Sequence, residues 1–170
     1  SLLSGKTLGI IGLGTIGKKL VELTKGFKLK YLAFDVKKDL IFSKNHNVEY
    51  CSLTDLLENS DIVSIHLNMA KENAGLINLE QLKRMKRSAL LVNTSRGEII
   101  NESELEIAIQ TGIISGAGLD VFQNEPYKGS LVKYNNIIAT PHIASYAKEI
   151  RIKMEMEAVQ NLIKGLQRYE

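Results

Sequence analysis

The sequence of 170 residues contains no tryptophan, two prolines and a single cysteine, Cys51. One cysteine can form neither an internal disulfide nor a cysteine-based zinc site, so no metal site is expected, and Cys51 is interpreted as a small buried hydrophobic residue. With so few prolines the chain has no proline-rich linker, and its length suits one domain of ordinary size. We therefore expect residues 1–170 to form one domain.

The chain also lacks long apolar runs and a strong charge of one sign. No run approaches the roughly 20 residues that span a membrane, and the N-terminus enters a glycine-punctuated strand without the layout of a signal peptide. The 22 Lys and Arg against 19 Asp and Glu give a net charge of +3, without the long basic stripe typical of nucleic-acid binding. We therefore expect a cytoplasmic globular protein with neither nucleic acid nor a membrane as a partner.

Six short apolar segments alternate with stretches of helical periodicity, which is typical of βαβ units on a parallel sheet. The segments are almost continuously apolar, as expected of strands that helices cover on both faces. The predicted fold class is therefore α/β, a doubly wound parallel sheet of the Rossmann type. The predicted strands are 8–11, 30–34, 62–66, 89–93, 116–121 and 137–139.

Helices are predicted between these strands from their periodicity and their capping residues. The first has apolar residues at helical spacing and Gly26 as its C-terminal stop. Three more begin at pairs that resemble capping boxes. The spaced residues of the first helix are Ile16, Leu20 and Leu23, and the capping pairs are Ser52 with Asp55, Asn78 with Gln81, and Asn101 with Glu104.

The last predicted helix is long, from about 145 to 165, and carries an apolar stripe formed by Ile150, Met154, Ala158 and Leu162. Such a stripe is more typical of a core or of a contact between subunits than of a ligand site. The stripe is larger than one small sheet needs, which favours a homodimer.

A glycine-rich turn at residues 12–17 lies directly between the first predicted strand and the first predicted helix. In this context the G-x-G-x-x-G spacing is typical of dinucleotide binding. Gly12 allows the sharp turn, Gly14 lets backbone N–H groups approach a pyrophosphate, and Gly17 lets the helix pack close to the strand. The phosphates then face the positive end of the helix. Taken alone, the hexapeptide also fits a packing device.

Asp35 follows the second predicted strand, 23 positions after Gly12. This is close to the spacing of about 20 at which an acidic side chain reaches the adenosine ribose hydroxyls. A carboxylate there also repels a 2′-phosphate, so the turn and Asp35 together predict NAD rather than NADP, with Lys37 and Lys38 able to soften the preference. The alternative interpretation of Asp35 is a solvated carboxylate at a strand end.

Three polar residues, Arg96, Glu125 and His142, follow the last three predicted strands, whose carboxyl ends meet at one edge of a parallel sheet. Hydride transfer to a ketone leaves a developing alkoxide, which needs a proton donor that titrates near working pH, and histidine is suitable. His142 is therefore the candidate proton donor. Each of the three residues, taken alone, also fits a structural or solvated role.

Four segments together resemble the signatures of the D-isomer-specific 2-hydroxyacid dehydrogenases, a family that includes D-lactate, D-glycerate and D-3-phosphoglycerate dehydrogenases. They occur in the family's order, and the resemblance to its cofactor-binding domain runs nearly end to end. The segments are residues 3–14, 93–97, 118–122 with 124–126, and 140–145.

This resemblance implies an oxidoreductase that moves a hydride between NADH and a 2-oxo acid, giving the 2-hydroxy acid. It implies that Arg96 holds the substrate carboxylate and carbonyl, that His142 exchanges the proton and that Glu125 pairs with His142. It also implies that Asp120 contacts the nicotinamide carboxamide. The expected cofactor-binding residues are Gly12, Gly14, Thr15, Ile16, Gly17, Asp35, Thr94, Arg96 and Asp120.

The chain departs from the family pattern in two respects. Where the family usually has a Pro-Leu-Thr run near the cofactor, this chain has Asn68-Met69-Ala70. Family members are also about twice as long and begin with a substrate domain that supplies part of the active site. We therefore expect an excised domain or one half of a split enzyme, with the substrate domain as its missing partner.

Two other functions remain open from the sequence. Some relatives of this family use NAD(H) binding to control association with transcription factors, so a dinucleotide-sensing corepressor is an alternative. A regulatory nucleotide-binding module of the kind attached to ion channels shares the glycine-rich turn and the acidic residue. Such a module has no need of Arg96, Glu125 and His142 together.

Overall fold

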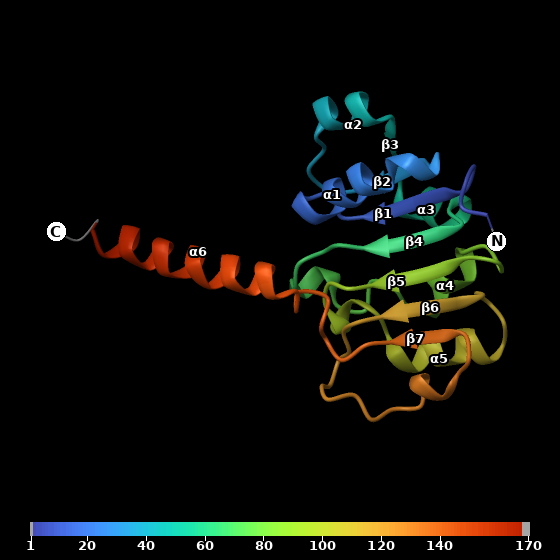
Figure 1. The fold of residues 1–170 in the computed structure, drawn as a ribbon. Coiled ribbons are helices and arrows are strands. Elements are labelled where there is room, and N and C mark those ends of the chain that lie inside the picture. Colours follow the sequence, from blue (N-terminus) through green and yellow to red (C-terminus); the bar gives the residue numbers. More distant parts are fainter. Residues whose placement is uncertain (1, 168–170) are drawn as a thin grey trace.

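A computed structural model of the chain describes residues 2–167, which form an α/β fold around one parallel sheet (Figure 1). The sheet has seven strands in the order β3-β2-β1-β4-β5-β6-β7. This is the predicted doubly wound arrangement. The strands are β1 (Thr7–Ile11), β2 (Lys30–Phe34), β3 (Val48–Tyr50), β4 (Ile62–Ile65), β5 (Leu90–Asn93), β6 (Gly116–Leu119) and β7 (Ile137–Ala139).

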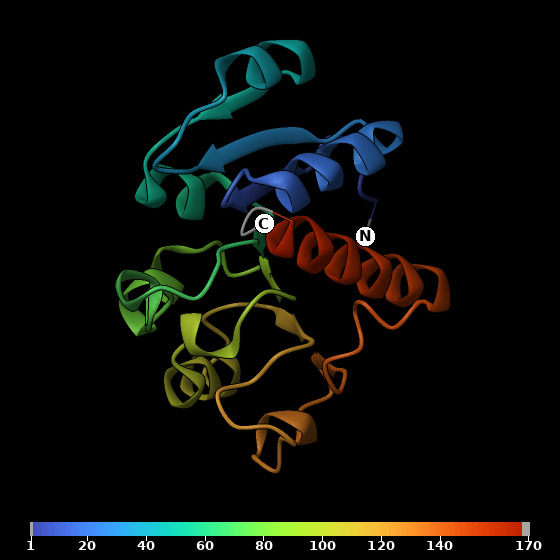
Figure 2. The same cartoon turned by 90° about the vertical axis from the view of Figure 1, so that its left-hand side faces the viewer.

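Helices lie on both faces of the sheet. Figure 2, which views the sheet from its carboxyl edge, shows α3, α4 and α5 on one face and α1 on the other. The α-helices are α1 (Thr15–Thr24), α2 (Leu40–His46), α3 (Leu53–Asn59), α4 (Leu79–Arg84), α5 (Glu102–Gln110) and α6 (Lys148–Leu166). Short 3-10 turns occur at η1 (Lys25–Phe27), η2 (Lys71–Asn73), η3 (Gly97–Ile99) and η4 (Leu131–Lys133).

The buried side chains form two clusters. The smaller one joins β1, α1, β2 and β3, and Phe42 of α2 packs against it. The larger one lies between β4–β6 and the helices α3–α5 and contains most of the fully buried residues. The two clusters lie on opposite faces of the sheet, since Ile10 of β1 belongs to the smaller cluster and its neighbour Ile11 to the larger one.

All six predicted strands are present, and a seventh, β3, was missed together with α2. β4 and β6 end earlier than predicted, at Ile65 and Leu119. The sequence signal for the missed pair is weak because β3 has only three residues and α2 buries none of its residues. Asp39 is the N-cap of α2, because its carboxylate accepts a hydrogen bond from the Phe42 N–H.

The prediction of Gly26 as the stop of the first helix is wrong. The helix ends at Thr24, continues as η1, and reaches the left-handed conformation at Lys28, with φ of 54°. The helix buries Gly17 and Val21, whereas Ile16 and Leu23 of the predicted stripe are largely exposed. Gly17 and Val21, four positions apart, share the face of α1 that packs on the sheet, and Leu20 packs partly buried beside them.

The three predicted N-caps are confirmed, but only one pair forms a reciprocal bond. The Ser52 hydroxyl accepts from the Asp55 N–H and donates to its carboxylate. Asn78 and Asn101 also cap α4 and α5. The Glu104 carboxylate, however, accepts from the N–H of Leu79 at the start of α4, so it links two helices instead of closing its own box.

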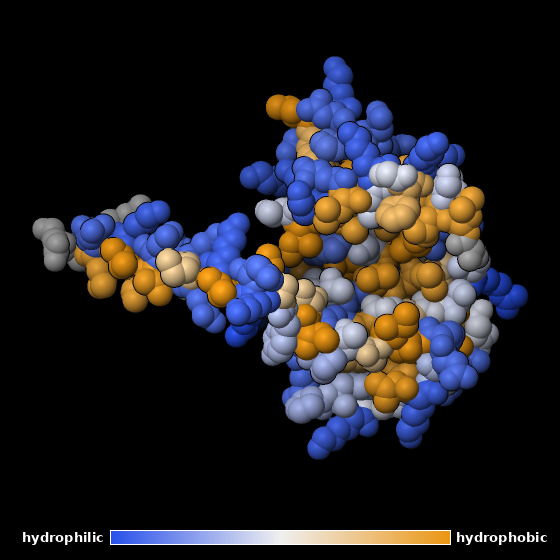
Figure 3. Space-filling model, viewed as in Figure 1, coloured by the Kyte–Doolittle hydropathy of each residue, from blue (hydrophilic) through white to orange (hydrophobic). Residues whose placement is uncertain are grey.

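On the α1 side, no helix of residues 2–167 covers β4–β7, and Figure 3 shows hydrophobic residues gathered on this face. Val92, Gly118 and Ile138 are paired across neighbouring strands, and Leu90 lies two positions before Val92. Ile138 is 73% exposed and Leu90 43% exposed. This half of the sheet therefore presents an apolar face to solvent.

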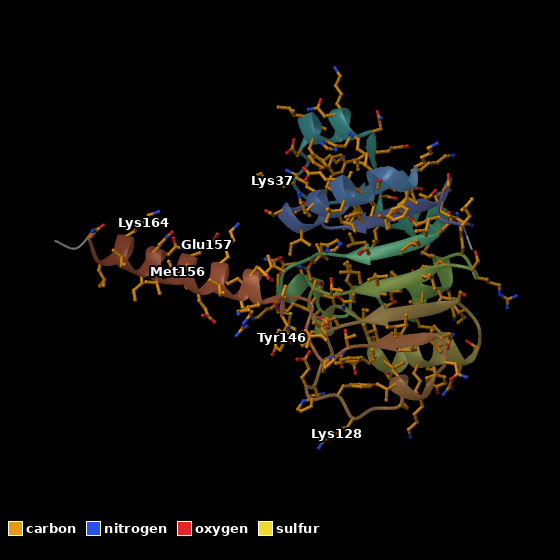
Figure 4. All side chains as sticks on the ribbon, in the orientation of Figure 1. Lys37, Lys128, Tyr146, Met156, Glu157 and Lys164 are labelled. Atoms are coloured by element: carbon orange, nitrogen blue, oxygen red, sulfur yellow. The ribbon has the colours of Figure 1, made fainter. Side chains whose placement is uncertain are left out.

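The last helix, α6, projects from the carboxyl edge of the sheet (Figure 1). None of its described residues is buried, and its apolar residues, including Ile150 and Met154, are about half exposed. Figure 4 shows the side chains of Met156, Glu157 and Lys164 standing away from the domain. Of the two alternatives for the stripe, core within this chain is therefore excluded for the described residues, and a contact between subunits stays a prediction. None of the described helices combines the length and hydropathy of a membrane span.

Candidate active site

The glycine-rich turn joins β1 to α1 at the carboxyl edge, beside the point where the strand order reverses between β1 and β4. Gly12 has φ of +94°, and a β-carbon there would lie 2.8 Å from the His66 carbonyl oxygen. At Gly17 a β-carbon would lie 2.4 Å from the Gly12 carbonyl oxygen. The two glycines thus make the sharp turn and the close helix packing that the spacing predicts.

The start of α1 fits a pyrophosphate. Its N-cap is Gly14, which provides no side chain to the free N–H groups of the first turn. A β-carbon at Gly14 would meet nothing within 4 Å, and Thr15 and Ile16 are exposed beside it. Open space in front of uncapped donors at the positive end of a helix is a suitable environment for an anion.

Asp35 lies directly after β2 and faces this turn. One of its carboxylate oxygens accepts a 2.7 Å hydrogen bond from the Leu13 N–H, and the other accepts one of 2.8 Å from the Lys37 N–H. Each oxygen keeps a second acceptor position. Lys37 is exposed (Figure 4), whereas the Lys38 ammonium lies 5.8 Å from the centre of the Tyr50 ring.

His142 and Glu125 are in direct contact, as the resemblance implies. The Glu125 Oε2 lies 2.8 Å from the His142 Nδ1, and its Oε1 accepts from the Phe122 N–H. The Phe122 N–H and His142 lower the pKa of the Glu125 carboxyl, so it is ionised at neutral pH. Because Nδ1 is engaged, Nε2 is the ring nitrogen left for a substrate.

Arg96 is exposed and lies on the loop between β5 and η3. This loop is held by Asn93, which is fully buried: its side-chain oxygen accepts from Ser95, and its side-chain nitrogen donates to the Arg96 carbonyl. Arg96, Glu125 and His142 line one cavity of about 230 Å³. The structure therefore brings the three predicted catalytic residues together.

Asp120 lies between β6 and the loop that carries Glu125, and it is 4% exposed. Its carboxylate accepts hydrogen bonds from Thr140, Ile143 and Ala144. Burial alone would raise the pKa of this carboxyl, but the three hydrogen bonds outweigh burial and lower it. Asp120 is thus an ionised group inside the loop of His142, and its predicted contact with the nicotinamide stays a prediction.

The sequence analysis missed two residues at this edge, Asn93 and His66. Asn93 was part of a quoted motif but received no role, although an Asn at a strand end before Thr94-Ser95 is a signal for a local turn. His66 follows β4, its Nε2 lies 2.9 Å from the Ser64 hydroxyl, and burial lowers the pKa of its imidazole.

One other hollow of the structure contains none of the predicted site residues. This hollow of about 920 Å³ lies at the opposite edge of the sheet, between Thr7, Leu32 and Asn59. No group of three or more potential metal-ligating side chains occurs among residues 2–167.

The sequence profile described as the D-isomer specific 2-hydroxyacid dehydrogenase, NAD binding domain, matches residues 1–144. This match includes the glycine-rich turn and extends through the loop of His142. The chain belongs to this family.

Relatives of this dehydrogenase family match nearly the whole chain. It is 44% identical to a glyoxylate reductase of Korarchaeum cryptofilum, over 94% of this chain and 48% of the relative. It is 38% identical to a hydroxypyruvate reductase of Blautia hydrogenotrophica, over 94% of this chain and 50% of the relative. The crystal structure of a glyoxylate reductase from Paecilomyes thermophila superimposes with a TM-score of 0.94 at 30% identity, covering 100% of this chain and 52% of that one.

The chain therefore spans about half the length of the dehydrogenases that it matches, and it corresponds to their NAD-binding domain. The expectation of this family, this fold and NAD as the cofactor is confirmed. The named relatives are reductases, and their names give no support to the corepressor alternative.

Proposed function

We propose that this chain is the cofactor-binding half of an enzyme that reduces a small 2-oxo acid, such as glyoxylate or hydroxypyruvate, to the 2-hydroxy acid. The observation that carries the proposal is the pair formed by the His142 Nδ1 and the Glu125 Oε2 at 2.8 Å, in the same cavity as Arg96. The relatives named as glyoxylate and hydroxypyruvate reductases support this choice of substrate.

The cofactor fits the carboxyl edge of the sheet. The N–H groups at the start of α1 hold the pyrophosphate, and the Asp35 carboxylate accepts hydrogen bonds from the adenosine ribose. Thr15, Ile16, Thr94 and Asp120 complete the proposed contacts, and the negative charge of Asp35 favours NAD over NADP. When bound, the reduced nicotinamide supplies the hydride.

The three proposed catalytic residues bind the substrate and supply the proton. The exposed Arg96 guanidinium anchors the substrate carboxylate with two parallel hydrogen bonds. As the hydride reaches the carbonyl carbon, the oxygen gains negative charge and takes the proton from the His142 Nε2. The Glu125 carboxylate stabilises the imidazolium before transfer and keeps the ring oriented through Nδ1.

The enzyme as a whole needs a second domain, which we propose covers the exposed Arg96 and excludes water from the cavity. Most of the stability of a helix in a protein comes from packing of its apolar face, yet α6 has 19 residues with none buried. The apolar face of β4–β7 is likewise uncovered. These surfaces support contact with a substrate domain and, as a separate proposal, a homodimer formed through α6.

Turnover tests the proposal. A protein that joins this chain to its substrate domain should oxidise NADH when glyoxylate or hydroxypyruvate is added, followed by the loss of nicotinamide absorbance. The same protein with Arg96→Gln should show a much higher KM for the 2-oxo acid, because the guanidinium anchor is lost. Absence of turnover with every small 2-oxo acid would refute the proposed activity.

A further inference from the structure

The loop that carries His142 has a conformation that needs support. His142 has φ of 56°, in the left-handed region that a residue with a β-carbon seldom adopts. The loop follows β7, an edge strand of three residues, and the side chain of His142 is about half exposed. Packing around the imidazole alone therefore does not explain why the ring stays against Glu125.

The support comes from Asp120, on the neighbouring strand end. Its Oδ1 accepts from the Thr140 hydroxyl at 2.5 Å and from the Ile143 N–H at 2.9 Å, and its Oδ2 accepts from the Ala144 N–H at 2.9 Å. The donors thus lie on both sides of His142 in the chain. The backbone of Asp120 is itself anchored to β5, because its N–H donates to the Asn93 carbonyl at 3.0 Å.

We propose that Asp120 is a positioning residue, whose carboxylate ties down residues 140–144 and so holds the His142 ring against Glu125. The inference rests on the proposed function, in which His142 delivers the proton. It adds a role to the contact with the nicotinamide that the family resemblance implies. The hydrogen bonds occupy three of about four acceptor positions of the carboxylate, which leaves one for such a contact.

The chemistry of the loop requires a carboxylate at this position. All three partners donate, and an ionised carboxylate only accepts. An amide at position 120 would turn an NH₂ group toward one of the backbone N–H groups of Ile143 or Ala144. We therefore expect Asp120→Asn to release one side of the loop even though its shape is nearly unchanged.

The pKa of the Glu125 carboxyl reports this release in the chain without cofactor. The hydrogen bond from His142 lowers this pKa, whereas the negative charge of Asp120 raises it by a smaller amount. Loss of the charge alone would therefore lower the pKa further in Asp120→Asn. Release of the loop would raise it, because Glu125 loses its histidine partner. The sign of the change separates the two effects.

The experiment is a pH titration of the Glu125 side-chain carbon by NMR, on the wild-type 170-residue chain and four variants. The reference is His142→Ala, which removes the partner completely. We expect Asp120→Asn to raise the Glu125 pKa by at least half of the rise seen in the reference. Thr140→Val, which removes one donor and keeps Asp120, should give a smaller rise and decides the test if Asp120→Asn does not fold.

The matched control is Asp61→Asn at the opposite edge of the sheet. Asp61 also accepts a backbone bond, from the Thr7 N–H at 2.9 Å, and it has lysine partners, but it lies away from His142. An unchanged or lowered Glu125 pKa in Asp120→Asn, or an equal rise in Asp61→Asn, would overturn the proposal. The titration uses neither cofactor nor substrate, so failure of the proposed function would appear separately, as undiminished turnover of His142→Ala in the joined enzyme.

Discussion

Replacing Asp35 tests how this chain selects its cofactor. In the structure each carboxylate oxygen of Asp35 has one backbone donor, from Leu13 or Lys37, and one free acceptor position. Asp35→Ala removes the acceptors for the ribose hydroxyls and also leaves the Leu13 N–H without its partner. A hydrogen bond to a charged group contributes about 1.5–3 kcal/mol.

Because Asp35 is partly exposed, we expect Asp35→Ala to lose the binding free energy of about one such hydrogen bond in total. At about 1.4 kcal/mol per tenfold change, NADH binding should weaken by roughly 10- to 150-fold. NADPH binding should stay equal or improve, because the repulsion of its 2′-phosphate is removed. The preference for NADH over NADPH should therefore fall by at least the same factor.

Calorimetric titration of the 170-residue chain with NADH and with NADPH measures both constants. Asp35→Asn keeps the size of the side chain, removes its charge and turns an NH₂ group toward the N–H of Leu13 or Lys37 in place of one acceptor. Glu49→Gln is the matched control. It also removes one negative charge, but from an exposed residue of β3 that lines the hollow at the edge of the sheet opposite the glycine-rich turn. An NADH affinity within twofold of wild type in Asp35→Ala, or an equal loss for NADPH, would refute the assignment of Asp35.

Three further predictions concern the proton donor, its carboxylate partner, and two carboxyls whose pKa is lowered. In the joined enzyme, His142→Ala should lower kcat by about 10²–10⁴-fold in stopped-flow reduction assays, with NADH affinity nearly unchanged; a loss below tenfold would exclude His142 as the acid. Glu125→Gln should move the basic limb of the reduction pH profile to lower pH, because reduction needs a protonated ring that the neutral amide stabilises less, and an unmoved limb would contradict the pairing. The folded chain lowers the pKa of Asp61 and Asp120 below the ordinary 3.8, so their stabilisation is present above that value and is lost as pH falls through the lowered values. Thermal unfolding followed by circular dichroism should show this acid loss, and Asp61→Asn should reduce it.

The fold, and the meeting of Arg96, Glu125 and His142 at one edge of the sheet, could be predicted because each depends on a local signal. The glycine-rich turn requires glycines at 12 and 17 for reasons of backbone geometry, and this fixed the place of β1 and α1. Arg96, Glu125 and His142 follow three neighbouring strands, so the parallel topology alone brings them to one edge.

What the sequence did not reveal depends on partners far apart in the chain. The Glu104 carboxylate looked like half of a capping box, but it accepts from Leu79, 25 positions earlier. Asp120 and its three donors are likewise 20 to 24 positions apart, so spacing within a motif could not assign the loop contact. The sequence left open whether the stripe of α6 forms core or a contact between subunits, because a helical apolar stripe looks the same in both settings.

The pairing of β1 with β4 gives the domain a seam with consequences for how it folds. Thr7 and Asp61, which are hydrogen-bonded across the seam, are 54 positions apart in the chain, so the two halves meet only after a long loop has closed. The larger hydrophobic cluster crosses this seam, since it joins Ile11 of β1 to Val63 and Ile65 of β4, so it is complete only after the halves have met. The crevice for the dinucleotide lies over the seam, so it exists only after the halves have joined. A bound dinucleotide should therefore hold the two halves together. The free energy of unfolding should then increase with the logarithm of the dinucleotide concentration.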